Sequence, residues 1–277
     1  MIRAVALPDG TTAPALGQGT WRMGEDARLR RREIDALRLG VDLGMTLIDT
    51  AEMYGDGGAE ELLGEALAGV RDQVFLVSKV YPHNAGRGRI ERACEASLGR
   101  LKTDRLDLYL LHWRGGVPLE ETVEGMHALV KAGKILRWGV SNLDQDDMDE
   151  LFAAGGEACA ANQILYNITE RGPEFELMPS LKRRGVPVVA YSPVGQGQLP
   201  RSPALAAAAA RHGATRFQIA LAWAMRDPDV IAIPKASDPA HVRDNRRAAD
   251  LVLTGEDLAE IDADFPPPTR RTRLAMI

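Results

Sequence analysis

The chain has 277 residues, of which 45% are hydrophobic and 26% are charged, and its formal net charge at pH 7 is −5. This composition is ordinary for a globular protein with room for a sizeable core, in one large domain or two small ones. A nucleic-acid-binding protein would more often show a basic face, and no apolar stretch approaches the ~18 residues of a membrane span. We therefore expect neither a nucleic-acid partner nor a membrane partner.

The two cysteines, Cys94 and Cys159, have neither metal-ligand spacing nor the number needed for a disulfide framework. We therefore expect no metal site. Cys94 falls on the apolar side of a helical pattern, so we expect it to be a buried, inert thiol. The first residues lack the apolar core of a signal peptide, which favours a cytoplasmic location. The sequence shows no obvious partner surface, and we expect a monomer.

The predicted elements begin with a β-hairpin over residues 4 to 16, in which Pro8-Asp9-Gly10 forms the turn. From Leu16 onward, short apolar runs alternate with patterns typical of amphipathic helices. The eight predicted strands end, in chain order, at Thr20, Asp49, Lys79, His112, Val140, Gln163, Tyr191 and Ile233. The predicted helices cover 31–43, the segment after Gly58, 88–101, 119–132, the segment capped by Asp144, 174–184, 203–212, 215–226, 239–248 and 255–263.

This regular alternation predicts an α/β fold with a parallel sheet and helical crossovers. Eight strand–helix units in roughly 250 residues match the size of a (β/α)8 TIM barrel, with an N-terminal β-hairpin and extra C-terminal helices. A doubly wound sheet is the alternative, but the sequence contains neither G-x-G-x-x-G nor a Walker P-loop. We expect one barrel domain over residues 1–277.

Titratable residues stand at the ends of three consecutive predicted strands: Asp49, Lys79 and His112. Barrel enzymes place their active site at the C-terminal ends of the strands, so these side chains should meet there, with Tyr54 in the first loop. A phenol has a pKa near 10, which a neighbouring cation lowers. We expect Lys79 to lower the pKa of Tyr54 and Asp49 to keep Lys79 charged. His112 would hydrogen-bond a substrate oxygen.

These residues resemble the Asp–Tyr–Lys–His tetrad of the aldo-keto reductases. The motifs that carry the resemblance are Asp49-Thr50-Ala51-Glu52-Met53-Tyr54-Gly55, Ser78-Lys79, Leu111-His112-Trp113, Gly139-Val140-Ser141-Asn142, Asn162-Gln163, Tyr191-Ser192-Pro193 and Ile233-Pro234-Lys235. They follow the family order over nearly the whole chain, and the likeness is closest to short bacterial methylglyoxal and aldehyde reductases. The resemblance implies an NADPH-dependent oxidoreductase that reduces small aldehydes and ketones to alcohols, with Tyr54 as general acid.

The resemblance also implies where a nicotinamide cofactor binds. The matching positions are Ser141, Asn142 and Gln163 for the carboxamide, Tyr191 and the adjoining Ser192 at the nicotinamide ring, Lys235 for the 2′-phosphate, and His241 and Asn245 at the adenosine end. Ala236 stands where the family has a serine, and His241 where many relatives have an arginine. A neutral histidine cannot offer the bidentate grip of a guanidinium. NADPH remains favoured, and NADH use stays open.

Trp21, Met53 and Trp113 lie just beyond predicted strand ends, and we expect them to line the substrate pocket. Simple packing is the alternative for these large side chains. The segment 266–277 is short for a loop that sets specificity, which favours an open pocket that accepts several small carbonyl compounds.

Two other functions remain compatible with the sequence. The first is a redox-sensing nucleotide-binding protein on the same fold, with little turnover. The second is an aldolase that uses Lys79 as a Schiff-base nucleophile, although the cofactor motifs have no purpose in that reaction. The sequence specifies neither the physiological substrate nor the direction of the reaction in the cell.

Overall fold

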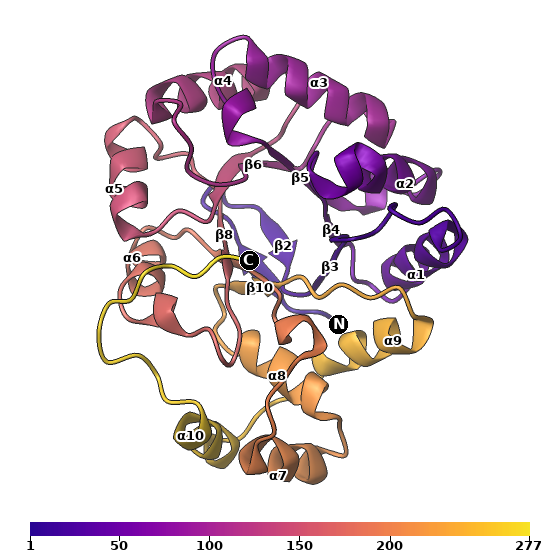
Figure 1. The fold of residues 1–277 in the computed structure, drawn as a ribbon, viewed down its shortest axis with the longest axis vertical. Coiled ribbons are helices and arrows are strands. Elements are labelled where there is room, and N and C mark those ends of the chain that lie inside the picture. Colours follow the sequence, from indigo (N-terminus) through magenta and orange to yellow (C-terminus); the bar gives the residue numbers. More distant parts are fainter.

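The computed structural model describes residues 1–277 and has an eight-stranded parallel barrel at its centre (Figure 1). Each strand pairs in parallel with the next one along the chain. The strands are β3 (Gly17–Gly19), β4 (Leu47–Asp49), β5 (Phe75–Val80), β6 (Leu108–Leu111), β7 (Trp138–Ser141), β8 (Asn162–Leu165), β9 (Val188–Tyr191) and β10 (Val230–Ala232). The predicted (β/α)8 barrel is therefore confirmed.

The barrel closes where the chain segments around β3 and β10 meet. Parallel bridges pair Leu16 with Ala232 and Gly19 with Lys235, and the Gly19 amide donates a 3.1 Å hydrogen bond to the Pro234 carbonyl. A Cβ atom added to Gly19 would lie only 2.9 Å from the Ile233 carbonyl oxygen. Because such a contact would force the two segments apart, the absence of a side chain at Gly19 is part of how the barrel closes.

Helices surround the barrel, and their apolar faces pack against the outer side of the strands (Figure 1). They are α1 (Arg30–Asp42), α2 (Gly58–Ala66), α3 (Arg89–Leu101), α4 (Leu119–Lys131), α5 (Gln145–Ala153), α6 (Leu177–Arg183), α7 (Pro203–His212), α8 (Arg216–Ala224), α9 (Pro239–Ala248) and α10 (Gly255–Asp264). The extra helices α7 and α10 pack on each other outside this ring. None of the ten helices has the length and apolar character needed to cross a membrane.

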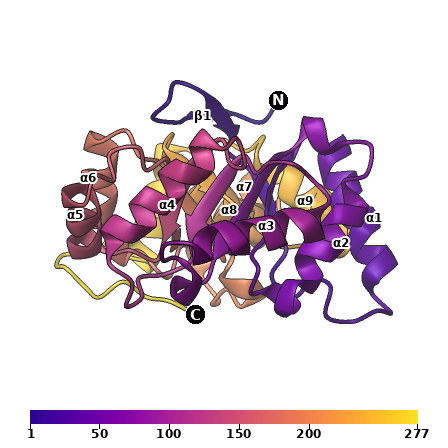
Figure 2. The ribbon, with the colours of Figure 1, turned by 90° about the horizontal axis from the view of Figure 1, so that it is seen from above.

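The N-terminal hairpin consists of β1 (Ala4–Ala6) and β2 (Thr12–Pro14), which pair antiparallel as expected. Its side chains Val5, Leu7 and Ala13 join the apolar cluster inside the barrel, which includes Leu47 and Leu110. Figure 2 shows the hairpin on one side of the molecule and the C-terminus on the other. The hairpin therefore closes the end of the barrel where the strands begin, and the opposite end is available for chemistry.

A buried carboxylate, Asp257, joins the two outer helices. It accepts hydrogen bonds from Arg211 Nη2 at 2.6 Å, His212 Nε2 at 2.7 Å and the Thr254 amide at 2.7 Å. Burial by itself would raise the pKa of Asp257, but the hydrogen bonds from His212, Thr254 and Arg211 outweigh it and lower the pKa below its ordinary value. The ionised carboxylate therefore stabilises the packing of α7 on α10.

We expect Asp257→Asn to reduce the free energy of unfolding at pH 7 by about 1–3 kcal/mol, because buried partners lose a charged acceptor. The folded pKa lies below the unfolded one, so this stabilisation is present at neutral pH. It is lost as the pH falls below about 4. Urea titrations at pH 7 and pH 3 should show the difference between wild type and variant shrinking in acid. Asp264→Asn, at an exposed position on the same helix, should have a smaller effect at pH 7.

Candidate active site

Four titratable side chains meet at the C-terminal ends of neighbouring strands. Asp49 is the last residue of β4, Lys79 lies in β5, and His112 follows β6, while Tyr54 begins the 3₁₀ turn η1 (Tyr54–Gly57) after β4. The Lys79 ammonium lies 2.8 Å from Asp49 Oδ2 and 3.1 Å from the Tyr54 hydroxyl oxygen. The rings of Tyr54 and His112 are 5.8 Å apart. The structure thus brings together the four residues predicted from the sequence.

Lys79 is fully buried, with all three ammonium protons directed at acceptors. Besides Asp49 and Tyr54, it donates to the Thr50 carbonyl at 2.7 Å. The second oxygen of Asp49 accepts from Gln163 Nε2 at 2.8 Å. A buried ion pair of this kind is stable only when its remaining hydrogen-bonding groups are satisfied. One amide proton of Gln163 therefore serves the ion pair, a contact that the sequence did not indicate.

The charge states follow from burial more than from neighbouring charges. Burial, followed by the negative charge of Asp49, raises the pKa of Tyr54 well above 10. This corrects the expectation that Lys79 would lower it. Burial also lowers the pKa of Lys79, against the charges of Asp49 and Glu60. Near pH 7 the phenol therefore keeps its proton.

The imidazole of His112 is neutral at physiological pH. Burial, with a smaller contribution from the charge of Lys79, lowers the pKa of His112 to about 2. Its Nδ1 is buried without a hydrogen-bond partner. A neutral imidazole offers one N–H donor. His112 can therefore donate a hydrogen bond to a substrate oxygen without carrying a charge into the site.

The predicted carboxamide and ring contacts lie on β7, β8 and β9 or directly after them. The Tyr191 hydroxyl donates to Asn142 Oδ1 at 2.9 Å, and Asn142 Nδ2 donates to Ser141 Oγ at 3.1 Å. Asn142 and Ser192 have φ angles of 59° and 47°, in the left-handed region. Non-glycine residues in this region are uncommon and concentrate at functional sites. Burial also raises the pKa of Tyr191 to about 12.

The predicted adenosine end lies at the same end of the barrel, after β10, which pairs with β9. Lys235 follows β10, is exposed, and donates to Ser237 Oγ at 3.3 Å without an ion-pair partner. His241 is exposed on α9, and Asn245 lies one helical turn further on. An unpaired cation here, with the Tyr191 ring at β9 and the side-chain amides of Asn142 and Gln163 at β7 and β8, forms a donor set that fits a nicotinamide nucleotide. Ser237 was not among the residues predicted.

Aromatic side chains form the wall around Tyr54. Trp21 meets the Tyr54 ring edge-on with centroids 5.0 Å apart, and Met53 packs beside Tyr54. Trp113 lies 4.9 Å from the His112 ring and 5.8 Å from the Tyr81 ring. The sequence-based prediction missed Tyr81 and His83, whose rings stack 4.9 Å apart. Both residues follow directly after the strand that carries Lys79, and this position could have indicated that they lie near the active site.

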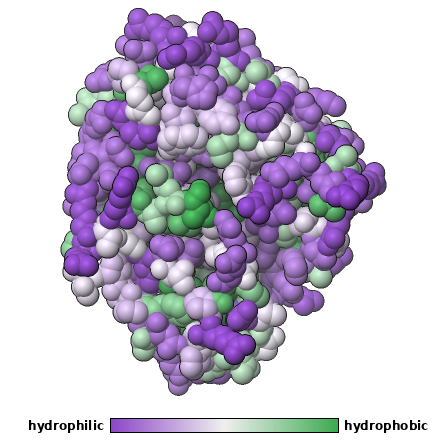
Figure 3. Space-filling view, viewed as in Figure 1, coloured by the Kyte–Doolittle hydropathy of each residue, from purple (hydrophilic) through white to green (hydrophobic).

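The C-terminal segment crosses the barrel mouth, where an open pocket was expected. In Figure 1 the chain runs from α10 past α6 to an end over the barrel centre. Arg271 pairs with Asp146 at 2.7 Å, and the backbone of Ile277 lies close enough to the Tyr191 hydroxyl to lower the pKa of that group against the larger effect of burial. Figure 3 shows apolar surface at the centre of this otherwise largely polar face. The expectation failed because these contacts join residues more than 80 positions apart, which local patterns do not reveal.

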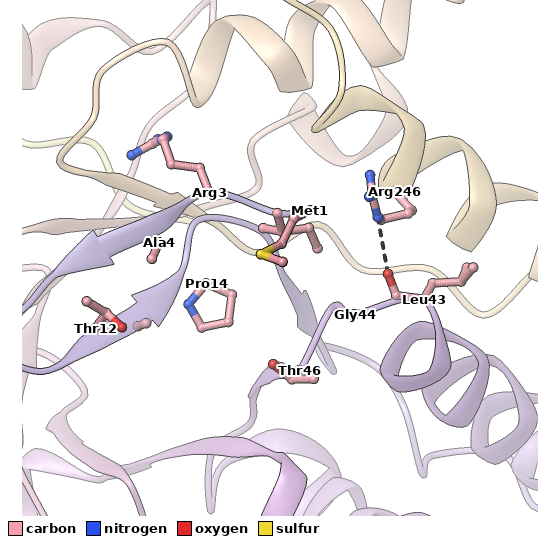
Figure 4. A pocket seen from close by; sticks show the side chains of 11 residues that line it. Met1, Arg3, Ala4, Thr12, Pro14, Leu43, Gly44, Thr46 and Arg246 are labelled. Carbon is pink, nitrogen blue, oxygen red and sulfur yellow. Dashed lines mark hydrogen bonds between the residues drawn. The ribbon is translucent and has the colours of Figure 1, made fainter.

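A separate cleft of about 310 Å³ lies at the hairpin end of the barrel (Figure 4). It includes Arg3 and Arg246, but Arg246 donates to the Leu43 carbonyl at 3.1 Å and pairs with Asp250 at 2.8 Å. Arg3 donates to backbone carbonyls, among them that of Met225. Because its cations are already engaged and it contains none of the tetrad, the candidate active site is the cluster at the opposite end of the barrel.

Comparison with known proteins agrees with this assignment. Residues 15–264 match the model of the aldo/keto reductase family. The chain is 52% identical to methylglyoxal reductase of Escherichia coli over 99% of each chain, and 32% identical to glyoxal reductase of Bacillus subtilis over 94% of this chain and 91% of that one. Two solved aldo-keto reductase structures from Klebsiella pneumoniae, one with NADP and acetate and one with NADPH, have TM-scores of 0.96. They are 51% and 53% identical to the chain over the full length of both.

Proposed function

The chain belongs to the aldo/keto reductase family, and we propose that it reduces small aldehydes and ketones, methylglyoxal among them, to alcohols with NADPH. The hydrogen bond from Lys79 to Tyr54 carries this proposal. The ammonium donates to the phenol oxygen, so the phenolic proton is not used in that contact. It is available to a carbonyl oxygen in the barrel mouth. We propose that residues 1–277 form one catalytic domain.

In the proposed reaction, Tyr54 donates its proton to the carbonyl oxygen as the oxygen gains negative charge. The buried Lys79 ammonium, 3.1 Å away, then stabilises the phenolate that remains. Asp49 keeps the ammonium in place, and neutral His112 orients the carbonyl by a hydrogen bond. The Tyr54 phenol is thus a weak acid in the resting site. It can still donate its proton during the reaction because the Lys79 ammonium stabilises the phenolate that forms.

NADPH supplies the hydride when it is bound, since none of these side chains can provide one. We propose that Tyr191, with the adjoining Ser192, would lie against the nicotinamide ring, while Ser141, Asn142 and Gln163 would hold its carboxamide. Lys235 would pair with the 2′-phosphate, and Ser237, His241 and Asn245 would lie beside it. The exposed Lys235 without a carboxylate partner supports NADPH over NADH.

The aromatic side chains around Tyr54 and the substrates of the relatives support the proposed substrate class. Methylglyoxal and glyoxal are the substrates named for the two reductases from Escherichia coli and Bacillus subtilis. The cation nearest to Tyr54 is already engaged by three acceptors, so it does not attract anionic substrates. The aromatic side chains Trp21 and Trp113 beside Tyr54 and His112 support an uncharged carbonyl compound as the substrate.

A panel of carbonyl compounds assayed with NADPH and NADH side by side tests the proposal. Absorbance at 340 nm should fall with methylglyoxal and an aromatic aldehyde, and the KM for NADPH should be lower than that for NADH. Protein that binds NADPH tightly but reduces no carbonyl would instead support a redox-sensing role. Borohydride trapping of a substrate on Lys79 would support an aldolase, although the three engaged ammonium protons argue against a free amine.

A further inference from the structure

A second buried carboxylate, Glu60, lies behind the strand that carries Lys79. Glu60 belongs to α2 and is fully buried. Its Oε1 accepts a hydrogen bond of 2.5 Å from Ser78 Oγ, and its Oε2 accepts one of 2.7 Å from Arg100 Nε. Successive side chains of a strand point to opposite faces, so Ser78 points outward to Glu60 while Lys79 points into the barrel. Only the thickness of β5 separates the two charges.

Arg100 connects the same carboxylate to the turn that carries Tyr54. It lies on α3, and its side chain also donates to Ser97 Oγ at 3.2 Å. Gly57, which ends η1, packs directly on Arg100: an added Cβ atom would lie 2.7 Å from Arg100 Cδ. With a φ of +91°, Gly57 also has a backbone conformation that disfavours other residues. Glu60, Ser78 and Arg100, here called the Glu60 network, therefore contact the segments that hold both Lys79 and Tyr54.

The Glu60 network also acts electrostatically. The charge of Glu60 opposes the effect of burial on the pKa of Lys79. Glu60 is fully buried, whereas the Arg100 side chain is 25% exposed, so solvent screens the arginine more strongly than the carboxylate. The other titratable groups that face the ammonium are Asp49, Tyr54 and His112.

We propose that Glu60 is a positioning residue for the carbonyl reduction. It holds Lys79 and Tyr54 in place relative to each other, and it supplies, beside Asp49, a second negative charge that favours the Lys79 ammonium. This role rests on the proposed function, because it presumes that the ammonium stabilises the Tyr54 phenolate. It predicts that the pH above which activity falls, the alkaline limb of the pH profile, moves down when the charge of Glu60 is removed. The same limb should move up when the charge of its counterion Arg100 is removed.

The test is the pH profile of kcat for methylglyoxal at saturating NADPH. Glu60→Gln keeps the shape and can still accept from Ser78, but it removes the charge, so the alkaline limb should move down by about one pH unit. Arg100→Gln removes the counterion and should move the limb up. The dissociation constant for NADPH, measured by fluorescence, should stay within about twofold of wild type in both variants, because neither residue faces the mouth.

Ser78→Ala is the matched control, because it removes the hydrogen bond and keeps both charges. It should leave the limb at the wild-type pH, whatever its effect on kcat. A folded Glu60→Gln protein with an unmoved limb, or two charge variants that move the limb in the same direction, overturns the proposal. If Glu60→Gln does not fold, an alkaline limb in Arg100→Gln that stays at the wild-type pH or moves down overturns the proposal as well. Absence of turnover in the wild type would overturn the proposed function itself, which separates the two failures.

Discussion

Tyr54→Phe is expected to lower kcat for methylglyoxal by about 10²–10⁴-fold, the range typical of losing a general acid. The substitution removes one oxygen and its proton. The ring keeps its edge-on contact with Trp21 and its place beside His112. NADPH affinity should therefore change little. The free energy of unfolding should fall by about 1–3 kcal/mol, because the buried Lys79 ammonium loses one of its three acceptors.

The measurements are the initial rate of NADPH oxidation and the fluorescence titration of NADPH, each with wild type and variant. Tyr81→Phe is the matched control, since it makes the same change on an aromatic side chain of the same wall without a bond to Lys79. Its kcat should stay within a few fold of wild type. A Tyr54→Phe protein that retains a tenth or more of wild-type kcat would remove Tyr54 from the role of proton donor.

Lys79→Met should abolish measurable reduction and also destabilise the protein by about 3–5 kcal/mol, the usual cost of leaving a buried charge without its partner. Asp49 would keep only the hydrogen bond from Gln163 among its present side-chain contacts. The Tyr54 phenolate would at the same time lose the only cation within hydrogen-bonding distance. One substitution therefore affects stability and catalysis through two different neighbours.

The double variant Asp49→Asn/Lys79→Met separates these effects. It removes both charges, so much of the lost free energy of unfolding should return in urea titrations, while activity should stay absent. Arg71→Met gives a comparison outside the site, because Arg71 pairs with Asp107 at 2.9 Å in a partly buried position. That variant should lose stability but keep its kcat. Recovery of activity in the double variant would contradict the role given to the Lys79 ammonium.

The C-terminal segment gives the proposed reductase a more covered mouth than its length suggests. The backbone of Ile277 lies near the hydroxyl of Tyr191, the residue proposed to pack against the nicotinamide ring. The segment thus lies beside the place where cofactor and substrate would meet. This arrangement is consistent with a preference for small carbonyl compounds.

The sequence by itself determined the barrel and the convergence of the tetrad. Its alternating apolar patterns specify parallel strands, and the C-terminal ends of parallel strands necessarily share one end of a barrel. Once Asp49, Lys79 and His112 were placed at the ends of three consecutive strands, their meeting followed from topology alone. The same reasoning placed Tyr191 and Lys235 on the rim of that end.

Only the tertiary structure decided the electrostatics and the long-range contacts of the site. The raised pKa of Tyr54 comes first from burial, which depends on the packing of the whole chain and outweighs the neighbouring cation visible in the motif. The Gln163–Asp49 bond, the Glu60–Arg100 pair and the course of the C-terminal segment join residues 40 to more than 100 positions apart. Local periodicity in the sequence indicates which face of a helix or strand is buried. The residues that this face contacts depend on the packing of the complete fold.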